Sequence, residues 1–71
     1  MKIKLLNDGG YKALDGIKFP VVVNGFEYDG LEHCIGVMGN ELLRIGAEEE
    51  FMYDATDLAF LVGEECEFVD E

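Results

Sequence analysis

This chain has 71 residues, 49% of them hydrophobic, and a formal net charge of −11 from 16 acidic and 5 basic side chains. The length predicts one domain over residues 1–71, the hydrophobic content argues against disorder, and no apolar run approaches the roughly 18 residues of a membrane span. The charge argues against direct binding to nucleic acid, because contacts to phosphate need lysine and arginine.

The first ten residues predict a strand followed by a turn. Polar and apolar residues alternate over residues 2–5, which places Ile3 and Leu5 on one buried face. Residues 7–10 (NDGG) are typical of a turn, and their adjacent glycines lack the spacing of a phosphate-binding loop. The segment also lacks the apolar core of a signal peptide, so we expect a cytoplasmic protein.

A hairpin is predicted around Asn24-Gly25, which lies between two β-rich runs in residues 19–28 (FPVVVNGFEY). Asn-Gly favours a type I′ turn, since that turn needs positive φ at both central residues. With this turn, Val23 faces Phe26 and alternate side chains share one buried face. The residues expected on that face are Phe19, Val21, Val23, Phe26 and Tyr28.

A second hairpin is predicted from residues 32–38 and 41–46, which flank Gly39-Asn40. Glycine at the first central position suits a type II′ turn. The alternative is a helix over residues 41–53 capped by Asn40, against which the interior Gly46 weighs by about 1 kcal/mol relative to alanine. Gly36 is expected to mark a bulge or a close backbone contact within the first of these strands.

The last third of the chain predicts further strands. Residues 58–62 are apolar, Gly63 interrupts them, and residues 66–69 then alternate. They form either a last hairpin turning at Gly63-Glu64 or one long strand bent at Gly63. A total of about five or six short strands with frequent turns predicts a mainly β fold. That fold is either a small SH3-like barrel or a compact antiparallel sheet, with room for one short helix.

The residue types that carry chemistry form no catalytic or metal-binding pattern. Cys34 and Cys66 lie far apart among apolar neighbours, so we expect two reduced thiols; a disulfide between them depends on geometry that the sequence does not give. His33 beside Cys34 lacks the spacing of a zinc site. The chain has no serine and one histidine, and neighbours on a strand point to opposite faces. We therefore expect no enzyme activity and no metal or cofactor site.

The acidic residues are concentrated in the second half of the chain. Residues 1–35 carry four basic and five acidic side chains, whereas residues 36–71 carry one and eleven. Because an acidic surface steers toward basic partners, we expect the partner-binding surface there. The residues expected to bind a basic protein surface are Glu48, Glu49, Glu50, Asp54 and Asp57, with Glu64, Glu65 and Glu67 as a second group. Phe51 and Tyr53 are candidates for apolar anchors beside them, or for core residues.

A short chain that enters a strand at once (MKIK) and has a heavy acidic bias resembles the small acidic proteins encoded by bacteriophages and mobile elements. The resemblance implies an accessory protein that acts on a host or phage protein inside a bacterial cell. The alternative is a nucleic-acid mimic, in which Glu65 and Glu67, about 6.6 Å apart on a strand, begin a row of phosphate-like charges. Unpaired sheet edges also suggest a homodimer.

Overall fold

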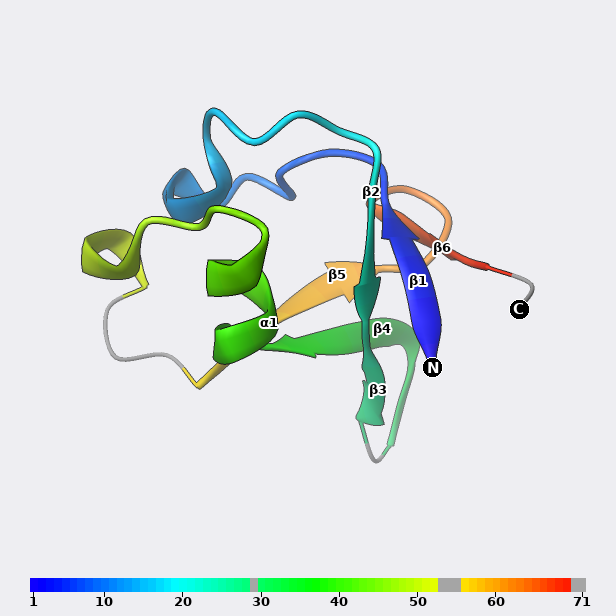
Figure 1. Ribbon diagram of the computed structural model, residues 1–71. Helices are drawn as coiled ribbons and strands as arrows, with labels where there is room; N and C mark the ends of the chain where they lie inside the picture. The colour runs from blue at the N-terminus through cyan, green and yellow to red at the C-terminus, as the bar shows by residue number, and fades with distance from the viewer. Residues whose placement is uncertain (29, 53–55, 70–71) are drawn as a thin grey trace.

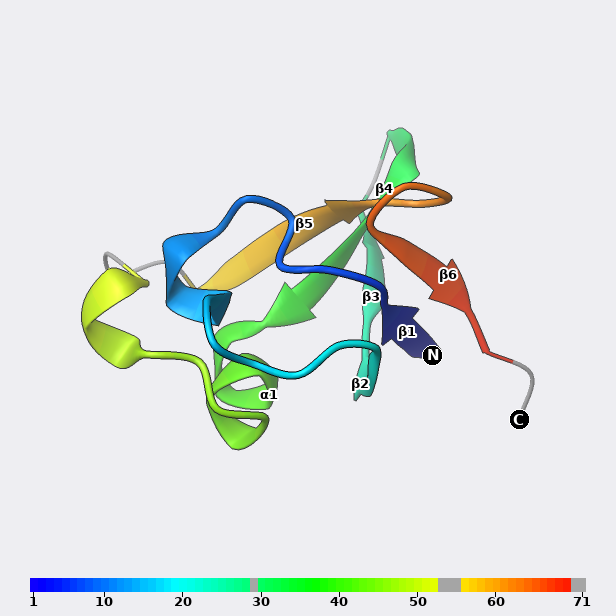
Figure 2. The same cartoon turned by 90° about the horizontal axis from the view of Figure 1, so that it is seen from above.

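The computed structural model describes residues 1–28, 30–52 and 56–69 and contains two three-stranded antiparallel sheets. Sheet A has the strand order β2-β1-β6, and sheet B has the order β3-β4-β5 (Figures 1 and 2). The strands are β1 (Lys2–Leu5), β2 (Val21–Asn24), β3 (Phe26–Tyr28), β4 (Leu31–Met38), β5 (Asp57–Leu61) and β6 (Cys66–Phe68). The helical segments are α1 (Gly39–Arg44) and the 3-10 turns η1 (Lys12–Leu14) and η2 (Glu49–Phe51).

The mainly β fold predicted from the sequence is confirmed, and of the two predicted alternatives the structure has the compact antiparallel sheet. Over the described residues, the two sheets do not close into an SH3-like barrel, and they form a compact antiparallel structure with one short α-helix. β1 is the central strand of sheet A, and its Ile3 and Leu5 are buried as the alternation predicts. None of the described helices combines the length and the apolar composition needed to cross a membrane.

The core lies between the two sheets, and the helical segments close one end of it (Figure 1). Its buried side chains come from sheet A (Ile3, Leu5, Val23, Cys66), sheet B (Ile35, Val37, Phe60) and the helical region (Ala13, Leu14, Leu42, Met52). Among the described residues no polar or charged side chain is buried.

β2 and β3 follow each other along the chain but belong to different sheets. β2 pairs with β1, whereas β3 pairs with β4, so the predicted hairpin at Asn24-Gly25 is wrong. The chain instead passes from sheet A to sheet B at Gly25, which does not have the positive φ of a type I′ turn. A Cβ at Gly25 would lie 2.8 Å from Ile35 Cγ2 and 3.1 Å from Ile3 Cδ1. Glycine is needed here for close packing between the sheets.

The change of sheet separates residues that were predicted to share one buried face. Val23 is buried in sheet A, whereas Phe26 pairs with Gly36 in sheet B. The Phe26 ring occupies the space that a Cβ on Gly36 would need, which confirms the close contact predicted at that glycine. Because Ile35 beside it is buried, Gly36 and Phe26 lie on the outer face of sheet B.

Two tight connections complete the strand order. β3 and β4 form a hairpin in which Tyr28 pairs with Leu31 and Gly30 has a φ of +80°. After β5, Gly63 with a φ of +97° turns the chain from sheet B into sheet A, where β6 pairs with β1. Since β5 and β6 lie in different sheets, neither arrangement predicted for residues 58–69 is correct.

The second predicted hairpin is also wrong, because residues 39–44 form the helix α1. Asn40 lies inside this helix and is not its cap, and the helix ends well short of residue 53. Gly46, with a φ of +111°, ends it. The N–H groups of Gly46 and of the next residue donate to the carbonyls of Leu43 and Leu42, the pattern of a Schellman cap. Gly46 therefore marks the end of a short helix, whereas inside a helix over residues 41–53 it would be unfavourable.

Candidate functional site

The predicted partner-binding residues fall into two groups at opposite ends of the molecule (Figure 1). The first group, Glu48, Glu49 and Glu50, lies at η2, and the second, Glu64, Glu65 and Glu67, lies at β6 and the turn before it. Asp57 begins β5, and Asp54 lies outside the described residues. The fold therefore does not bring these carboxylates together on one surface.

Glu48, Glu49 and Glu50, which we call the η2 cluster, are three consecutive exposed carboxylates. Neither of the two ion pairs between described residues involves them. The main chain anchors the cluster, because the Glu48 N–H donates to the carbonyl of Ala13 in η1 at 2.9 Å. The cluster is thus attached to the body of the domain and presents its charges to solvent.

Phe51, the last residue of η2, is half-buried and packs against the core. Lys12 Nζ lies 4.5 Å from the centroid of its ring, within the range of a cation–π contact. Phe51 therefore serves the core more than it serves as an exposed anchor, and Tyr53, the other proposed anchor, lies outside the described residues.

Two carboxylates of the second group are used within the fold. Glu65 Oε1 accepts a hydrogen bond from the Leu61 N–H at 2.8 Å, and Glu67 forms an ion pair with Lys4 at 3.5 Å. Glu64 is exposed. Because Glu65 turns back onto β5 and Glu67 pairs across to β1, these side chains do not form the free row that a nucleic-acid mimic needs.

Asp57 joins the two outer strands of sheet B. Its Oδ1 accepts a hydrogen bond from the Tyr28 hydroxyl at 2.8 Å, although β4 lies between β3 and β5. Burial of Tyr28, together with this hydrogen bond, raises the pKa of the phenol from 10.0 to about 12. Asp57 therefore has a structural partner on the outer face of sheet B.

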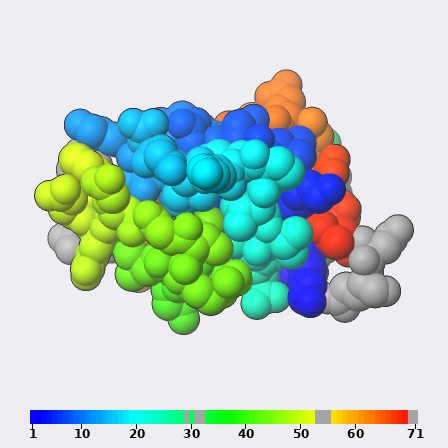
Figure 3. All heavy atoms as spheres, turned by 45° about the horizontal axis from the view of Figure 1, so that its top comes forward, coloured from blue at the N-terminus to red at the C-terminus, as the bar shows by residue number. Residues whose placement is uncertain are grey.

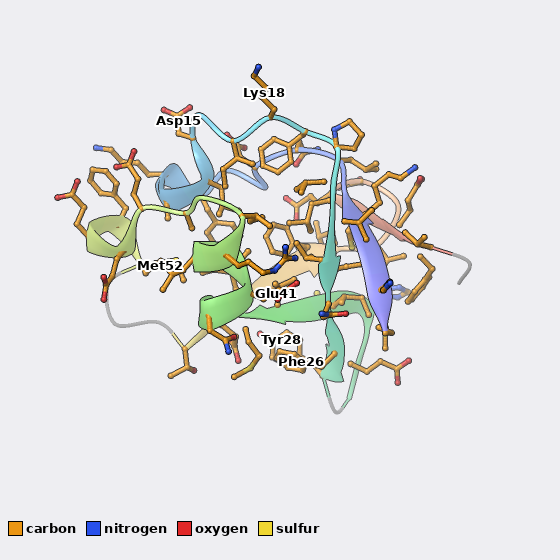
Figure 4. The ribbon with its side chains drawn as sticks, in the orientation of Figure 1. Asp15, Lys18, Phe26, Tyr28, Glu41 and Met52 are labelled. Carbon is orange, nitrogen blue, oxygen red and sulfur yellow. The ribbon has the colours of Figure 1, made fainter. Side chains whose placement is uncertain are left out.

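Glu41 protects the free edge of β2, a role that the sequence analysis missed. The Gly25 N–H donates to the Met1 carbonyl, so the Asn24 N–H, one residue earlier, points away from β1. Glu41 Oε1 accepts that N–H at 3.0 Å, and the same carboxylate pairs with Arg44 (Figure 4). The hydrogen bonds from Arg44 and then from the Asn24 backbone lower the pKa of the Glu41 carboxyl.

A groove of about 270 Å³ lies between α1 and β2, which are side by side in Figure 3. The residues that line it are Lys2, Val22, Val23, Asn24, Glu41 and Arg44. Its volume lies just below the range of about 300–1,000 Å³ that is usual for small-molecule sites. Arg44 is paired with Glu41, so Lys2 is the charged lining residue that this ion pair does not use.

Side chains also cover the free edge of β5. The Tyr11 hydroxyl donates to the Ala59 carbonyl at 2.8 Å, and Glu65 accepts the Leu61 N–H. Together with Glu41 on β2, these contacts occupy backbone groups through which a second copy would add its own strand. These caps lie on one edge of each sheet, β2 and β5, and the homodimer expected from open strand edges stays a prediction.

An apolar surface covers the outer side of sheet B, and the sequence analysis did not identify it. We call it the outer apolar face; its residues are Phe26, Tyr28, Cys34, Met38, Ala59 and Leu61. The assignment follows from the register, because Gly36 pairs with both Phe26 and Ala59 while Ile35 and Val37 on either side of it are buried. The alternation in residues 34–38 separates the inner from the outer side chains of β4. The apolar face can be assigned from it only when the partner strands of β4 are known.

The two cysteines are free thiols in different surroundings. Cys34 is half-buried on the outer apolar face, whereas Cys66 is fully buried. Burial raises the pKa of the Cys66 thiol, which disfavours the reactive thiolate. Within residues 1–28, 30–52 and 56–69, no three His, Cys, Asp or Glu side chains gather as metal ligands.

Comparison with known proteins adds no relative. No protein-family model matches the chain, and neither the curated proteins nor the solved structures give a significant match.

Proposed function

We propose that the protein is a non-enzymatic acidic module that binds a basic surface of a partner protein through the η2 cluster. The supporting observation is the exposure of three consecutive carboxylates on an anchored turn, in a half of the chain whose sole basic residue is Arg44. Like charges held close together repel one another and cost stability, so a use for them is expected. A basic surface is the partner that relieves this repulsion.

The resemblance to small acidic phage and mobile-element proteins supports an accessory role in a bacterial cytoplasm, directed at a host or phage protein. The distribution of charge supports a local contact more than nucleic-acid mimicry. A mimic needs continuous rows of free carboxylates, whereas Glu65 and Glu67 are engaged by Leu61 and Lys4.

Binding of a ten-residue lysine peptide tests this proposal. The test variant replaces Glu48, Glu49 and Glu50 with glutamine. The control replaces Asp15 with asparagine and Glu27 and Glu64 with glutamine, at three exposed sites that are dispersed along the chain. Both variants lose three charges from the parent value of −11, so they differ only in where the charges are removed.

We expect the η2 cluster variant to bind the lysine peptide about tenfold more weakly than the parent, and the dispersed control to lose much less. Binding of the parent should also weaken steeply with salt, since exposed charges are screened over about 8 Å at physiological ionic strength. Equal losses in both variants would mean that net charge alone attracts the peptide and that the cluster is no site. Basic proteins retained from a bacterial lysate by the parent and lost with the cluster variant would then identify the partner.

A further inference from the structure

The outer apolar face is built as a continuous surface outside the main core. The rings of Phe26 and Tyr28 pack edge to face with centroids 5.1 Å apart, and they lie side by side at sheet B in Figure 4. Neither ring belongs to the core or to the half-buried residues packed against it. Met38 and Leu61 are 48% and 41% exposed on the same face. Contiguous apolar surface of this kind on a small protein is typical of an interaction site.

The charged side chains that the described part of β5 and the turn after it place around this face are acidic. Asp57 lies on it, bonded to Tyr28, and Glu65 lies beside Leu61 at the edge of β5. Strands β3, β4 and β5 contain no lysine or arginine. A partner that covers the face must therefore place apolar side chains on the sheet and, at its margins, either uncharged or positive groups.

We propose that the outer apolar face receives the apolar side of a basic amphipathic segment of the partner protein, whose lysines or arginines reach Asp57, Glu65 and the rest of the acidic surface. The inference rests on the proposed function, because it names the kind of segment that carries the basic surface. A second copy of this chain fits poorly, since it would bring two acidic margins together in a protein of net charge −11.

The test uses two synthetic helical peptides of equal positive charge. One is an 18-residue leucine–lysine peptide with its leucines on one face, and the other has glutamine in place of each leucine. The protein itself supplies a local reporter, because Cys34 lies on the face while Cys66 is fully buried. The rate at which iodoacetamide alkylates Cys34, followed by mass spectrometry, measures whether a bound peptide covers the face.

Two matched substitutions locate the contact. Leu61→Thr alters the outer apolar face, and Val22→Thr alters the outside of sheet A at a strand position of nearly equal exposure, 41% against 42%. We expect the leucine–lysine peptide to slow Cys34 alkylation and to bind about fivefold more weakly to Leu61→Thr, with less than about a twofold effect for Val22→Thr. Met38→Gln provides a second alteration of the face, and thermal unfolding shows which variants remain folded.

Each outcome decides between the two proposals. Binding that leaves Cys34 alkylation unchanged, tolerates Leu61→Thr and is lost with glutamines in the η2 cluster would overturn this inference and leave the proposed function in place. Equal affinity for the leucine and glutamine peptides would also overturn it. Failure of both peptides to bind would contradict both proposals. A dimer in sedimentation, with Cys34 already protected in the protein alone, would show that a second copy covers the face.

Discussion

At the scale of single residues, Gly25 allows the two sheets to meet. The chain leaves sheet A at Asn24 and enters sheet B at Phe26, so Gly25 lies where Ile3 of one sheet and Ile35 of the other approach. A Cβ there would also lie 3.2 Å from the Gly36 carbonyl oxygen, which belongs to the backbone and cannot rotate away. The residue is needed because of contacts with distant parts of the chain and not because of its own turn.

Gly25→Ala should lower the free energy of unfolding by about 1–3 kcal/mol, since the added methyl overpacks a core contact. The loss is expected to exceed that of Gly36→Ala, whose Cβ would meet the ring of Phe26, a half-buried side chain that can swing toward solvent. Urea denaturation of both variants gives the comparison. An unchanged midpoint for Gly25→Ala would show that the sheets have room to separate at this crossing.

At the scale of elements, side chains cover one free edge of each sheet, that of β2 and that of β5. Glu41 from α1 covers the Asn24 N–H on β2, and Tyr11 and Glu65 cover Ala59 and Leu61 on β5. These caps use carboxylates and a phenol in the place of a neighbouring strand. They give part of the acidic excess a structural task, whereas neither of the two ion pairs between described residues involves the η2 cluster.

Tyr28 links β3 to β5, and this link should weaken in alkali. Its folded pKa of about 12 lies above the ordinary 10.0, because burial and Asp57 favour the neutral phenol. The stabilisation is therefore complete below pH 10 and is lost as the pH rises toward 12. Tyr28→Phe keeps the ring against Phe26 but removes the ionisable group. We expect its free energy of unfolding to approach that of the parent over this pH range, as measured by denaturation at pH 9, 10, 11 and 12. A constant difference between the two proteins would show that Tyr28 does not titrate in this way.

The sequence predicted the strands more reliably than their partners. Alternation correctly placed Ile3 and Leu5 in the core and identified a strand before Gly63, because those signals depend on the residues themselves. Asn24-Gly25 failed as a hairpin because its local turn preference is weaker than the packing of Ile3 against Ile35 around it. The outer apolar face stayed hidden for a related reason, since it unites residues of three strands whose register only the fold defines.

At the scale of the whole molecule, charge opposes folding. The chain concentrates a net charge of −11 within a radius of gyration of 11.1 Å, and the two ion pairs between described residues engage two of its five cations. Self-repulsion of this kind destabilises a compact state. A basic partner and added salt both reduce this repulsion. The change in the free energy of unfolding with salt therefore indicates how strongly the repulsion destabilises the fold.

Raising NaCl from about 10 mM to about 300 mM should therefore stabilise the isolated protein, because the screening length falls well below the size of the molecule. A gain of about 1 kcal/mol would raise the thermal midpoint by about 4–8 °C in a domain of this length.

The variant with glutamine at Glu48, Glu49 and Glu50 should start from a higher midpoint at low salt and gain less from salt, since adjacent exposed charges repel most strongly. The dispersed Asp15, Glu27 and Glu64 control has the same net charge and should fall between that variant and the parent. A midpoint that drops with salt would mean that the pairs Lys4–Glu67 and Arg44–Glu41 outweigh the repulsion, and the energetic reason for a basic partner would then be lost.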